Sequence, residues 1–219
     1  MEVYSTEEQQ VEAIKKWWHD NKWSVIGGVV LGIAALTGGR AWIDNKNAYT
    51  EMASANYQIM LENISQGKND LAAEQGAQLL GQFGDTPYAA LAALAMAKIK
   101  VDSGDLVAAS SHLRWALDNT QQEPVKHEAR LRLARVLLSQ DKADEALALI
   151  NGIDAGTYTS SYEELKGDIF VAQGQAGAAR TAYTRALGEM APNAPGRQML
   201  QMKLDDLGVT SSDAAGSAS

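Results

Sequence analysis

The stretch that decides the fold begins at Ala97 and reads AKIKVDSGDLVAASSHLRWA, ending at Ala116. Apolar residues recur at intervals of three and four on both sides of Gly104, which is typical of two amphipathic helices joined by a turn. Glycine ends helices readily because it adopts the left-handed conformation without steric cost. Ala109 and Ala116 are small residues at positions where the two helices would approach each other closely. The stretch therefore predicts a helical hairpin.

The same pattern recurs along the chain. Its central alanines are Ala109, Ala146 and Ala179, which follow one another at a near-constant spacing, and Ala73 lies one further interval before the first. A repeat of about 34 residues with this helix-turn-helix pattern resembles the tetratricopeptide repeat. One helical hairpin could arise by chance, but three in succession favour a solenoid. The sequence thus predicts an all-α fold in which residues 44–207 form a tetratricopeptide-like helical-hairpin solenoid.

Prolines and glycines mark where the helices begin and end. Thr86 is a candidate N-cap before Pro87, and Pro124 also stands at the expected first turn of a helix. We expect a last helix over 195–207 to cover the exposed core of the final repeat, as terminal repeats usually require. The Gly/Ser/Ala-rich residues 208–219 cannot bury enough apolar surface to order themselves, so we expect a disordered tail there.

A second decisive feature is the uncharged run between Lys22 and Arg40, WSVIGGVVLGIAALTGG. Extended to Ile43, the run is long enough for a helix to cross the hydrocarbon core of a bilayer, with Arg40 snorkelling to the interface. Tryptophans flank both ends of the run, as in the aromatic belts of membrane proteins. We therefore expect a leader over 1–22 and a single transmembrane helix over 23–43.

Two other interpretations of this run are a buried core helix and a cleavable signal peptide. A core helix rarely carries tryptophans at both ends, and the leader has five acids against three lysines, unlike the short basic region of a signal peptide. A single-pass signal anchor fits better. Three lysines before the span against Arg40 and Lys46 after it favour a cytoplasmic N-terminus only slightly. Whether the membrane helix continues into the first soluble helix also stays open.

Gly28 and Gly32 form a GxxxG pair within the apolar run. Small residues at this spacing let two membrane helices pack closely against each other. Glycine is also common in membrane helices without any packing role. We expect Gly28 and Gly32 to form a membrane-packing face, directed toward a second copy of the chain or toward another membrane helix.

Composition excludes several classes of function. The part of the chain from Asp44 onward carries 15 Lys and Arg against 22 Asp and Glu, a net charge of −7, which argues against binding of nucleic acid. The chain has no cysteine, which rules out disulfides and thiol chemistry but fits reducing and oxidising compartments equally. His19, His112 and His127 lack metal-ligand spacing, and no phosphate-binding loop, dinucleotide fingerprint or hydrolase elbow occurs. We expect no enzymatic activity, no cofactor and no metal site.

In solenoids of this kind, the first helix of each repeat lines the concave face, where partners bind. Registering the repeats on Ala109 and Ala146 predicts a partner-binding groove formed by Leu94, Lys98, Val101, Leu131, Arg135 and Leu138. Leucines beside cations would suit an extended segment that carries apolar side chains and acidic groups. The alternative is that Leu94 and Leu131 pack against the preceding helix, which leaves Lys98 and Arg135 as the cleaner test of the groove.

Several segments, taken in order, resemble the YfgM family of ancillary subunits of the bacterial Sec translocon. They are QVEAIKKWW at 10–18, RLRLARV at 130–136, Gly167-Asp168 and MLQMKLDDL at 199–207. The resemblance implies an inner-membrane protein with a cytoplasmic N-terminus and a periplasmic repeat domain. It also implies association with the SecYEG channel and with the membrane-anchored chaperone PpiD, and assistance to unfolded client proteins that emerge from the channel.

Two functions from different classes compete. The first is a binding module, in which a membrane-tethered repeat scaffold holds a partner chaperone, a client chain or both. The second, also implied by the family resemblance, is negative regulation of the Rcs envelope-stress response through a cytoplasmic leader that binds its response regulator. An enzyme has no support from the residues. Deletion of residues 2–16 would discriminate the first two functions, because association with the translocon should survive it and restraint of the regulator should not.

Overall fold

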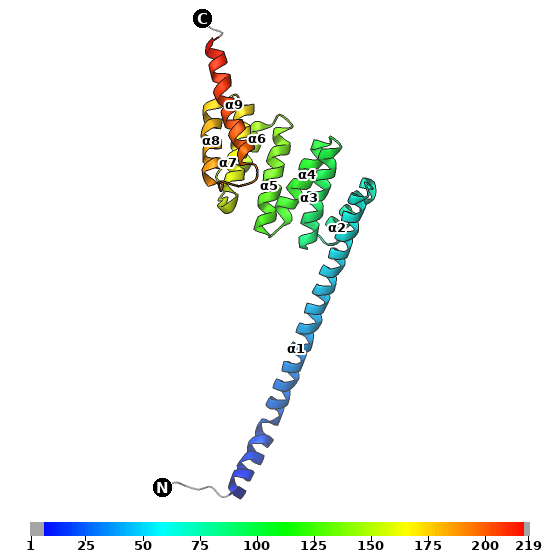
Figure 1. Cartoon of the computed structure of the whole chain (residues 1–219). Coiled ribbons are helices and arrows are strands. Elements are labelled where there is room, and N and C mark those ends of the chain that lie inside the picture. The colour runs from blue at the N-terminus through cyan, green and yellow to red at the C-terminus, as the bar shows by residue number, and fades with distance from the viewer. Residues whose placement is uncertain (1–6, 217–219) are drawn as a thin grey trace, which may run out of the picture. The chain divides into compact units, whose positions relative to one another are not determined.

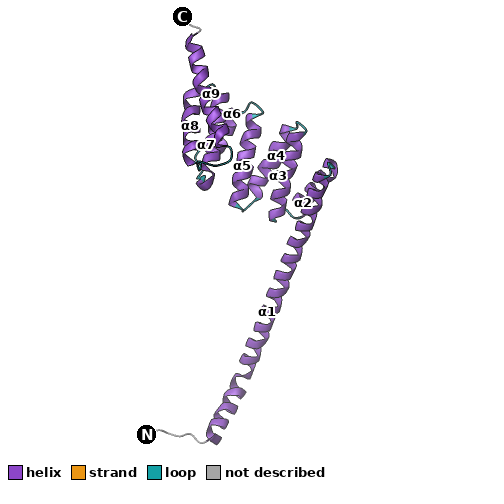
Figure 2. Cartoon of the chain, viewed as in Figure 1, coloured by secondary structure: helices purple, strands orange, loops and turns teal. Residues whose placement is uncertain are grey.

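A computed structural model describes the backbone of residues 7–216 and the side chains of 9–208. Every regular element among the described residues is helical, which confirms the all-α fold class (Figure 2). The elements are α1 (Glu7–Ser65), α2 (Asn69–Gln82), α3 (Pro87–Asp102), α4 (Leu106–Asn119), α5 (Glu123–Leu138), α6 (Ala143–Ile150), the 3₁₀ turn η1 (Gly156–Tyr158), α7 (Thr159–Ala172), α8 (Ala176–Glu189) and α9 (Arg197–Gly216).

The chain divides into two units, Met1–Glu51 and Met52–Ser219. Helix α1 runs without a break from Glu7 to Ser65, so it belongs to both units. The helix that contains the apolar run therefore continues into the first soluble helix, a question that the sequence left open. No glycine or proline interrupts the stretch from Arg40 to Ser65, which is consistent with a continuous helix.

Among the described residues, α1 is the one helix that is long and apolar enough to cross a membrane. None of its apolar window is buried inside the protein, whereas the core helix of a soluble protein would be mostly buried. Trp23 and Trp42, which flank the apolar run, are exposed over 77% and 67% of their surface. Such exposure of large apolar side chains is expected where lipid, rather than protein, surrounds a helix.

The second unit is a series of antiparallel helix pairs whose turns share one geometry. The turn residues Gly67, Gly104, Asp141 and Gly174 all adopt positive φ, between 60° and 80°. In each turn this residue donates its N–H to the carbonyl three residues earlier, and the next residue donates to the carbonyl five residues earlier, at 2.8–3.0 Å. This is the Schellman arrangement, which satisfies the last carbonyl groups of a helix. The four turns recur at intervals close to the length of a tetratricopeptide repeat, roughly 34 residues, so they define the repeat.

Five residues after each of these turns, a small side chain lies where two helices cross. Ala109, Ala146 and Ala179 are fully buried, as their spacing in the sequence predicts. In the first pair the equivalent residue is Ala72, which is fully buried, rather than Ala73, which is only half-buried. The position assigned to Ala73 from the sequence was therefore wrong by one residue, because that pair carries two alanines side by side.

Helices α3 to α9 follow one another side by side in chain order (Figure 1). Buried residues of α3 to α7 form one core cluster, and those of α8 and α9 form another. The largest cluster of buried residues includes Leu113 of α4, Leu133 of α5 and Ile169 of α7. Helices α7 and α8 pack closely at Gly167, where a Cβ atom would overlap the ring of Tyr183 at Cε1. Only glycine fits there, because the tyrosine ring occupies the space of any larger side chain.

The helix boundaries follow the proline signals in two of three cases. Pro87 and Pro124 lie in the first turns of α3 and α5. Thr86 does not act as a side-chain cap, since its hydroxyl donates to the carbonyl of Phe83 at 2.7 Å. Pro195 precedes the last helix, which begins at Arg197 instead.

Helix α9 also differs from the sequence expectation at its C-terminal end. Residues 208–219 are expected to form a disordered tail, but α9 continues through Gly216, and residues 217–219 lie outside the described part. Extending a helix that is already formed costs much less than starting one, because nucleation is the unfavourable step. Within the extension, Ala214 and Ala215 favour a helix, whereas its other residues are weak helix formers, so the preceding helix is the main cause.

Candidate partner-binding surface

A surface pocket of about 330 Å³ lies where α3, α4 and α5 meet. Its apolar wall comes from small and branched side chains, and all of these except the exposed Val101 also belong to the core. Three cationic side chains complete it, one from α3 and two from α5. The lining residues are Ala97, Lys98, Val101, Leu113, Arg132, Arg135 and Val136.

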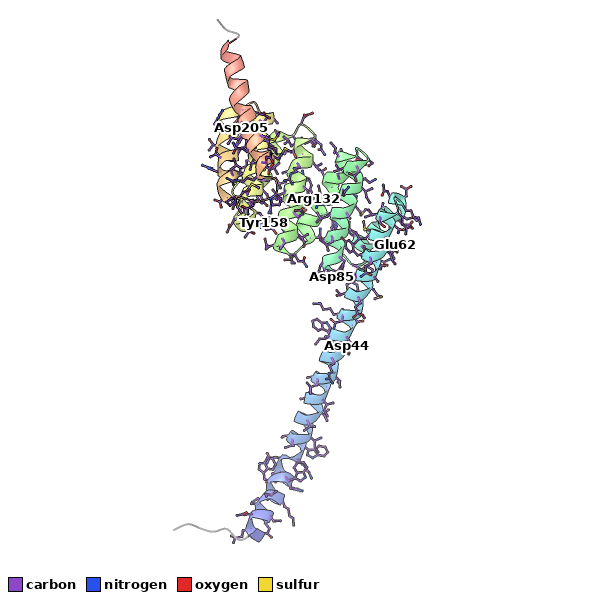
Figure 3. All side chains as sticks on the ribbon, in the orientation of Figure 1. Asp44, Glu62, Asp85, Arg132, Tyr158 and Asp205 are labelled. Carbon is purple, nitrogen blue, oxygen red and sulfur yellow. The ribbon has the colours of Figure 1, made fainter. Side chains whose placement is uncertain are left out.

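Two of the three cations at this α3/α5 pocket form ion pairs within their own helices. The ammonium of Lys98 lies 2.6 Å from Asp102, and Nε of Arg132, which is labelled in Figure 3, lies 2.5 Å from Glu128. Both pairs are exposed and span one helical turn, so they contribute little to stability. Arg135 is exposed, and its guanidinium has no ion pair or side-chain hydrogen bond among the described residues. The pocket therefore offers one cation that the chain itself does not neutralise.

The structure brings together half of the groove predicted from the sequence. Lys98, Val101 and Arg135 line the α3/α5 pocket. Leu94 and Leu131 are only 7% and 3% exposed and belong to the core, so they pack between helices, as the alternative interpretation has it.

Leu138, the sixth residue of the predicted groove, is half-buried and packs against the same core as Leu94 and Leu131. Sequence reasoning missed Arg132, which lies one turn before Arg135 on the same helix face. The three-residue spacing of these two arginines was the available signal.

A second pocket, of about 430 Å³, lies beside α9 and is lined by Val171, Gly174, Ala176, Tyr183, Lys203, Asp206 and Leu207. At this α7/α9 pocket, Lys203 joins α9 to α7. Its ammonium donates to Glu164 at 2.8 Å and to both oxygens of Asp168 at 2.8 and 3.0 Å. The hydroxyl of Tyr183 donates to Oδ1 of Asp168, at 2.8 Å. Lys203 thus connects the last helix to α7 through two carboxylates.

Burial and hydrogen bonding shift the pKa values of this cluster. Burial alone lowers the pKa of Lys203, but the hydrogen bonds to Asp168 and Glu164 outweigh it, and the pKa is raised above its usual value. Burial, followed by the hydrogen bond to Asp168, raises the pKa of Tyr183 as well. At neutral pH the cluster therefore holds a charged lysine and a neutral tyrosine.

The histidines of the repeat unit lie in ordinary packing environments. The ring of His127 stacks on Tyr158 with centroids 4.6 Å apart, and its Nδ1 lies 2.9 Å from the hydroxyl of Tyr162. Burial lowers the pKa of His112, and the nearby Lys100 adds to the effect. Within the described residues, no group of three or more histidine, aspartate or glutamate side chains could hold a metal ion.

In the other unit, Gly28 and Gly32 lie on the exposed surface of α1. A Cβ atom built on either glycine would have no neighbour within 4 Å. Nothing within the described part of the chain therefore requires glycine at these two positions. Any requirement for small residues there would come from a molecule outside the chain.

Comparisons with known proteins agree with the repeat architecture. The family model described as "Tetratricopeptide repeat-like domain" matches residues 15–209. A protein of Escherichia coli (strain K12) named "Ancillary SecYEG translocon subunit" is 32% identical over 95% of this chain and 100% of its own length. Proteins of the same name from Haemophilus influenzae and Neisseria gonorrhoeae are 29% and 30% identical, over 92% and 94% of this chain and 97% and 100% of their own lengths.

These relatives match 92% to 95% of the chain, so the likeness covers both the apolar helix and the helical repeats. The chain has one helix that could span a membrane, followed by a tetratricopeptide-like repeat unit. The resemblance to the family of translocon subunits implies the same arrangement. The chain therefore belongs to the family of ancillary SecYEG translocon subunits.

Proposed function

We propose that this chain is an ancillary subunit of a bacterial SecYEG translocon that acts as a membrane-tethered binding scaffold. The observation that carries the proposal is the match over nearly the whole chain to proteins named as such subunits. A scaffold fold in a translocon subunit suggests a non-catalytic role. The partners would be the SecYEG channel, a periplasmic chaperone like PpiD, and unfolded client proteins as they leave the channel.

This function requires a defined orientation in the bacterial inner membrane. Residues 23–43 of α1 would cross the bilayer once, the leader 1–22 would lie in the cytoplasm, and the repeats would lie in the periplasm. The long exposed apolar surface of α1 supports the span. The orientation rests on the family resemblance, because lysines before the span barely outnumber the cations after it.

The repeat unit supplies a surface suited to a protein partner. The α3/α5 pocket combines an apolar wall, from Val101, Leu113 and Val136, with the unpaired cation of Arg135. A few well-placed apolar and cationic anchors dominate the binding energy of most protein interfaces. The face that contains this pocket is therefore the proposed site for the chaperone or client.

Site-specific photocrosslinking in native membranes tests the proposal. A photoreactive amino acid would replace Val101 on α3, with Val107 on α4 as the matched control, since both valines are exposed. Crosslinked partners would be identified by mass spectrometry. We expect Val101 to capture a periplasmic chaperone or translocated clients, and a photoreactive residue in α1 to capture a SecYEG subunit. Absence of translocon components and translocated proteins from all adducts would refute the proposal.

Regulation of the Rcs response through the leader is the second candidate function. The described part of the leader is helical, and its side chains from Gln9 to Asp20 are exposed, which would leave them accessible to a cytoplasmic protein. Deleting residues 2–16 separates the two functions. Loss of Rcs restraint with intact translocon crosslinks would assign the regulatory role to the leader, whereas unchanged Rcs signalling would exclude it.

A further inference from the structure

The α3/α5 pocket combines a buried apolar floor with a cationic rim. Leu113, which lines the floor, is almost completely buried, whereas Val101 at the edge is 41% exposed. Lys98, Arg132 and Arg135 supply the charged part of the lining, and all three are exposed. A partner side chain that fills the pocket therefore meets apolar groups at one end and cations at the other.

The α3/α5 pocket, of about 330 Å³, is large for a single side chain. A closed apolar cavity of about 150 Å³ already accepts a benzene molecule. The pocket can therefore hold the ring of a phenylalanine or tryptophan, together with a second group beside it.

The cationic rim favours an aromatic side chain over an aliphatic one. Ammonium and guanidinium groups are attracted to the face of an aromatic ring, and more strongly where water is excluded. Arginine also stacks on such rings through its planar guanidinium. An aliphatic side chain in the same place would remove water from the cations without an attractive interaction to compensate, and such removal costs free energy.

The charges at the rim suit one carboxylate of a partner rather than several. Lys98 and Arg132 form ion pairs with Asp102 and Glu128 of their own helices. Arg135 has no such partner among the described residues, so three cations and two acids leave a charge of +1. A guanidinium binds a carboxylate through two parallel hydrogen bonds. A second carboxylate would be repelled by Asp102 and Glu128.

We propose that the α3/α5 pocket binds an extended segment of a partner protein through one aromatic side chain and one carboxylate two residues away from it. The ring lies against Leu113 and Val136 beneath the cations of the rim, and the carboxylate pairs with Arg135. The spacing follows because alternate side chains of an extended segment project to the same side. The inference rests on the proposed function, since unfolded clients present extended segments and the pocket would select among them.

Four synthetic peptides test the proposal with the full-length chain in nanodiscs of neutral lipid. The reference peptide is a Gly- and Ser-rich segment with one tryptophan and one glutamate two residues from it. In the comparison peptides leucine replaces the tryptophan, glutamine replaces the glutamate, or the glutamate stands directly beside the tryptophan. The last of these has the same composition as the reference, so it tests the spacing alone.

Binding is measured by fluorescence anisotropy and corrected for binding to empty nanodiscs. The reference peptide should bind about tenfold more tightly than the leucine and glutamine peptides, equivalent to about 1.4 kcal/mol. It should also bind more tightly than the peptide with adjacent glutamate and tryptophan. If any comparison peptide binds as tightly as the reference, the proposal is wrong.

Variants of Arg135 test the ion pair separately from the ring. Arg135→Gln should bind the glutamate and glutamine peptides equally, because the unpaired cation is gone, and should still prefer tryptophan to leucine. Arg135→Glu should prefer a peptide that carries lysine in place of the glutamate. The control, Arg114→Gln, changes an exposed arginine of α4 outside the lining of the pocket and should keep every preference. A preference for glutamate that persists in Arg135→Gln would overturn the proposal.

The unaltered chain supplies a second measurement that does not depend on how the variants fold. An aromatic ring changes the chemical shifts of methyl groups that lie against its face. The reference peptide should therefore shift the methyl NMR signals of Val101 and Val136 more than the leucine peptide does. It should leave in place those of Val107 and Val171, two exposed valines outside the pocket. Equal shifts with both peptides would contradict an aromatic occupant, and shifts that depend on chain concentration without peptide would make this face a contact between copies instead.

These results can be separated from those on the proposed function. If photocrosslinks from Val101 still capture a periplasmic chaperone or clients while the four peptides bind equally, the aromatic and carboxylate chemistry falls and the scaffold function stands. If the reference peptide binds as expected while no translocon component is captured, the pocket chemistry stands and the translocon role falls.

Discussion

Gly167 on α7 faces the ring of Tyr183 on α8 so closely that a Cβ atom would overlap two ring carbons, Cε1 and Cδ1. The tyrosine cannot move away easily, because its hydroxyl donates to Asp168 and the residue is only 2% exposed. We expect Gly167→Ala to lower the free energy of unfolding by about 1–3 kcal/mol through overpacking. Urea unfolding followed by circular dichroism measures this change.

Gly188 on α8 provides the matched control for this substitution. A Cβ atom there would have no neighbour within 4 Å, and the residue lies within a helix. Gly188→Ala should raise the free energy of unfolding by up to about 1 kcal/mol, because alanine has the higher helix propensity. If both variants are stabilised, the close approach of α7 and α8 at Gly167 is not real.

Some individual residues of this fold could be predicted from the sequence, and others could not. The central alanines Ala109, Ala146 and Ala179 could be found because small residues at helix crossings recur at a near-constant spacing. Asp141 could not be recognised as a turn residue equivalent to Gly104, since it adopts φ of 60° without being glycine. Aspartate tolerates this conformation better than most residues, but its sequence pattern is less specific than that of glycine.

At the scale of elements, α9 is joined to α7 by the cluster around Lys203. Replacing Lys203 with methionine keeps the aliphatic stem but leaves Glu164 and Asp168 without their cation. We expect Lys203→Met to lower the free energy of unfolding by about 1–3 kcal/mol, less than for a fully buried pair because the side chain is partly exposed. Lys142→Met, on the surface, should change it by less than about 0.5 kcal/mol. Equal losses in urea unfolding would show that Lys203 has no special role.

The same cluster predicts how stability depends on pH. Burial lowers the pKa of Lys203, but hydrogen bonds to Asp168 and Glu164 leave it raised, and burial raises the pKa of Tyr183. When the pKa of a group is higher in the folded than in the unfolded chain, its stabilising effect is fully present at pH values below the unfolded-state pKa. This effect is lost as the pH rises through the folded-state pKa. Stability should therefore fall above about pH 10, and less steeply in a Lys203→Met, Tyr183→Phe variant. Unfolding measured from about pH 8 to pH 11 tests this, and identical slopes would contradict it.

In α1, the glycine pair Gly28 and Gly32 can be tested without disturbing the repeats. Gly28→Leu with Gly32→Leu adds bulk to positions that have no neighbour within 4 Å. If the pair packs against another membrane helix, the double variant should insert normally but co-purify with less SecYEG, because close crossing needs small residues. Unchanged co-purification would make these residues ordinary membrane glycines. Val29→Leu with Ile33→Leu, on the same helix, is the control.

The elements themselves were predicted more fully than their ends. The hairpins follow from apolar spacing, and Pro87 and Pro124 mark two helix starts correctly. The sequence did not decide whether α1 continues past Asp44, because polar residues there fit a loop and an exposed helix equally well. The composition of the tail also gave no reason to extend α9 beyond Leu207, because it does not show that a packed helix comes directly before the tail.

At the scale of the whole molecule, three of the six residues predicted for the groove line one pocket, and there is a physical reason why the other three do not. Repeat register identifies the helix face, so Lys98, Val101 and Arg135 were placed together correctly. The repeat register does not show which leucines on that face are buried by a neighbouring helix. Leu94 and Leu131 are buried in this way, so they do not line the pocket. The second pocket was missed because its lining depends on where α9 packs beside α7 and α8, which the repeat register does not give.

The proposed function requires that α1 anchors the chain in the membrane with the repeats outside the cytoplasm. The chain contains no cysteine, so single cysteines give unambiguous labels. Glu12→Cys in the leader and Glu74→Cys in α2 are exposed positions on the two sides of the apolar run. With a membrane-impermeant maleimide on spheroplasts, we expect Glu74→Cys to react at once and Glu12→Cys to react only after the membrane is opened. The reverse pattern, or equal labelling of both before opening, would contradict the topology and the function built on it.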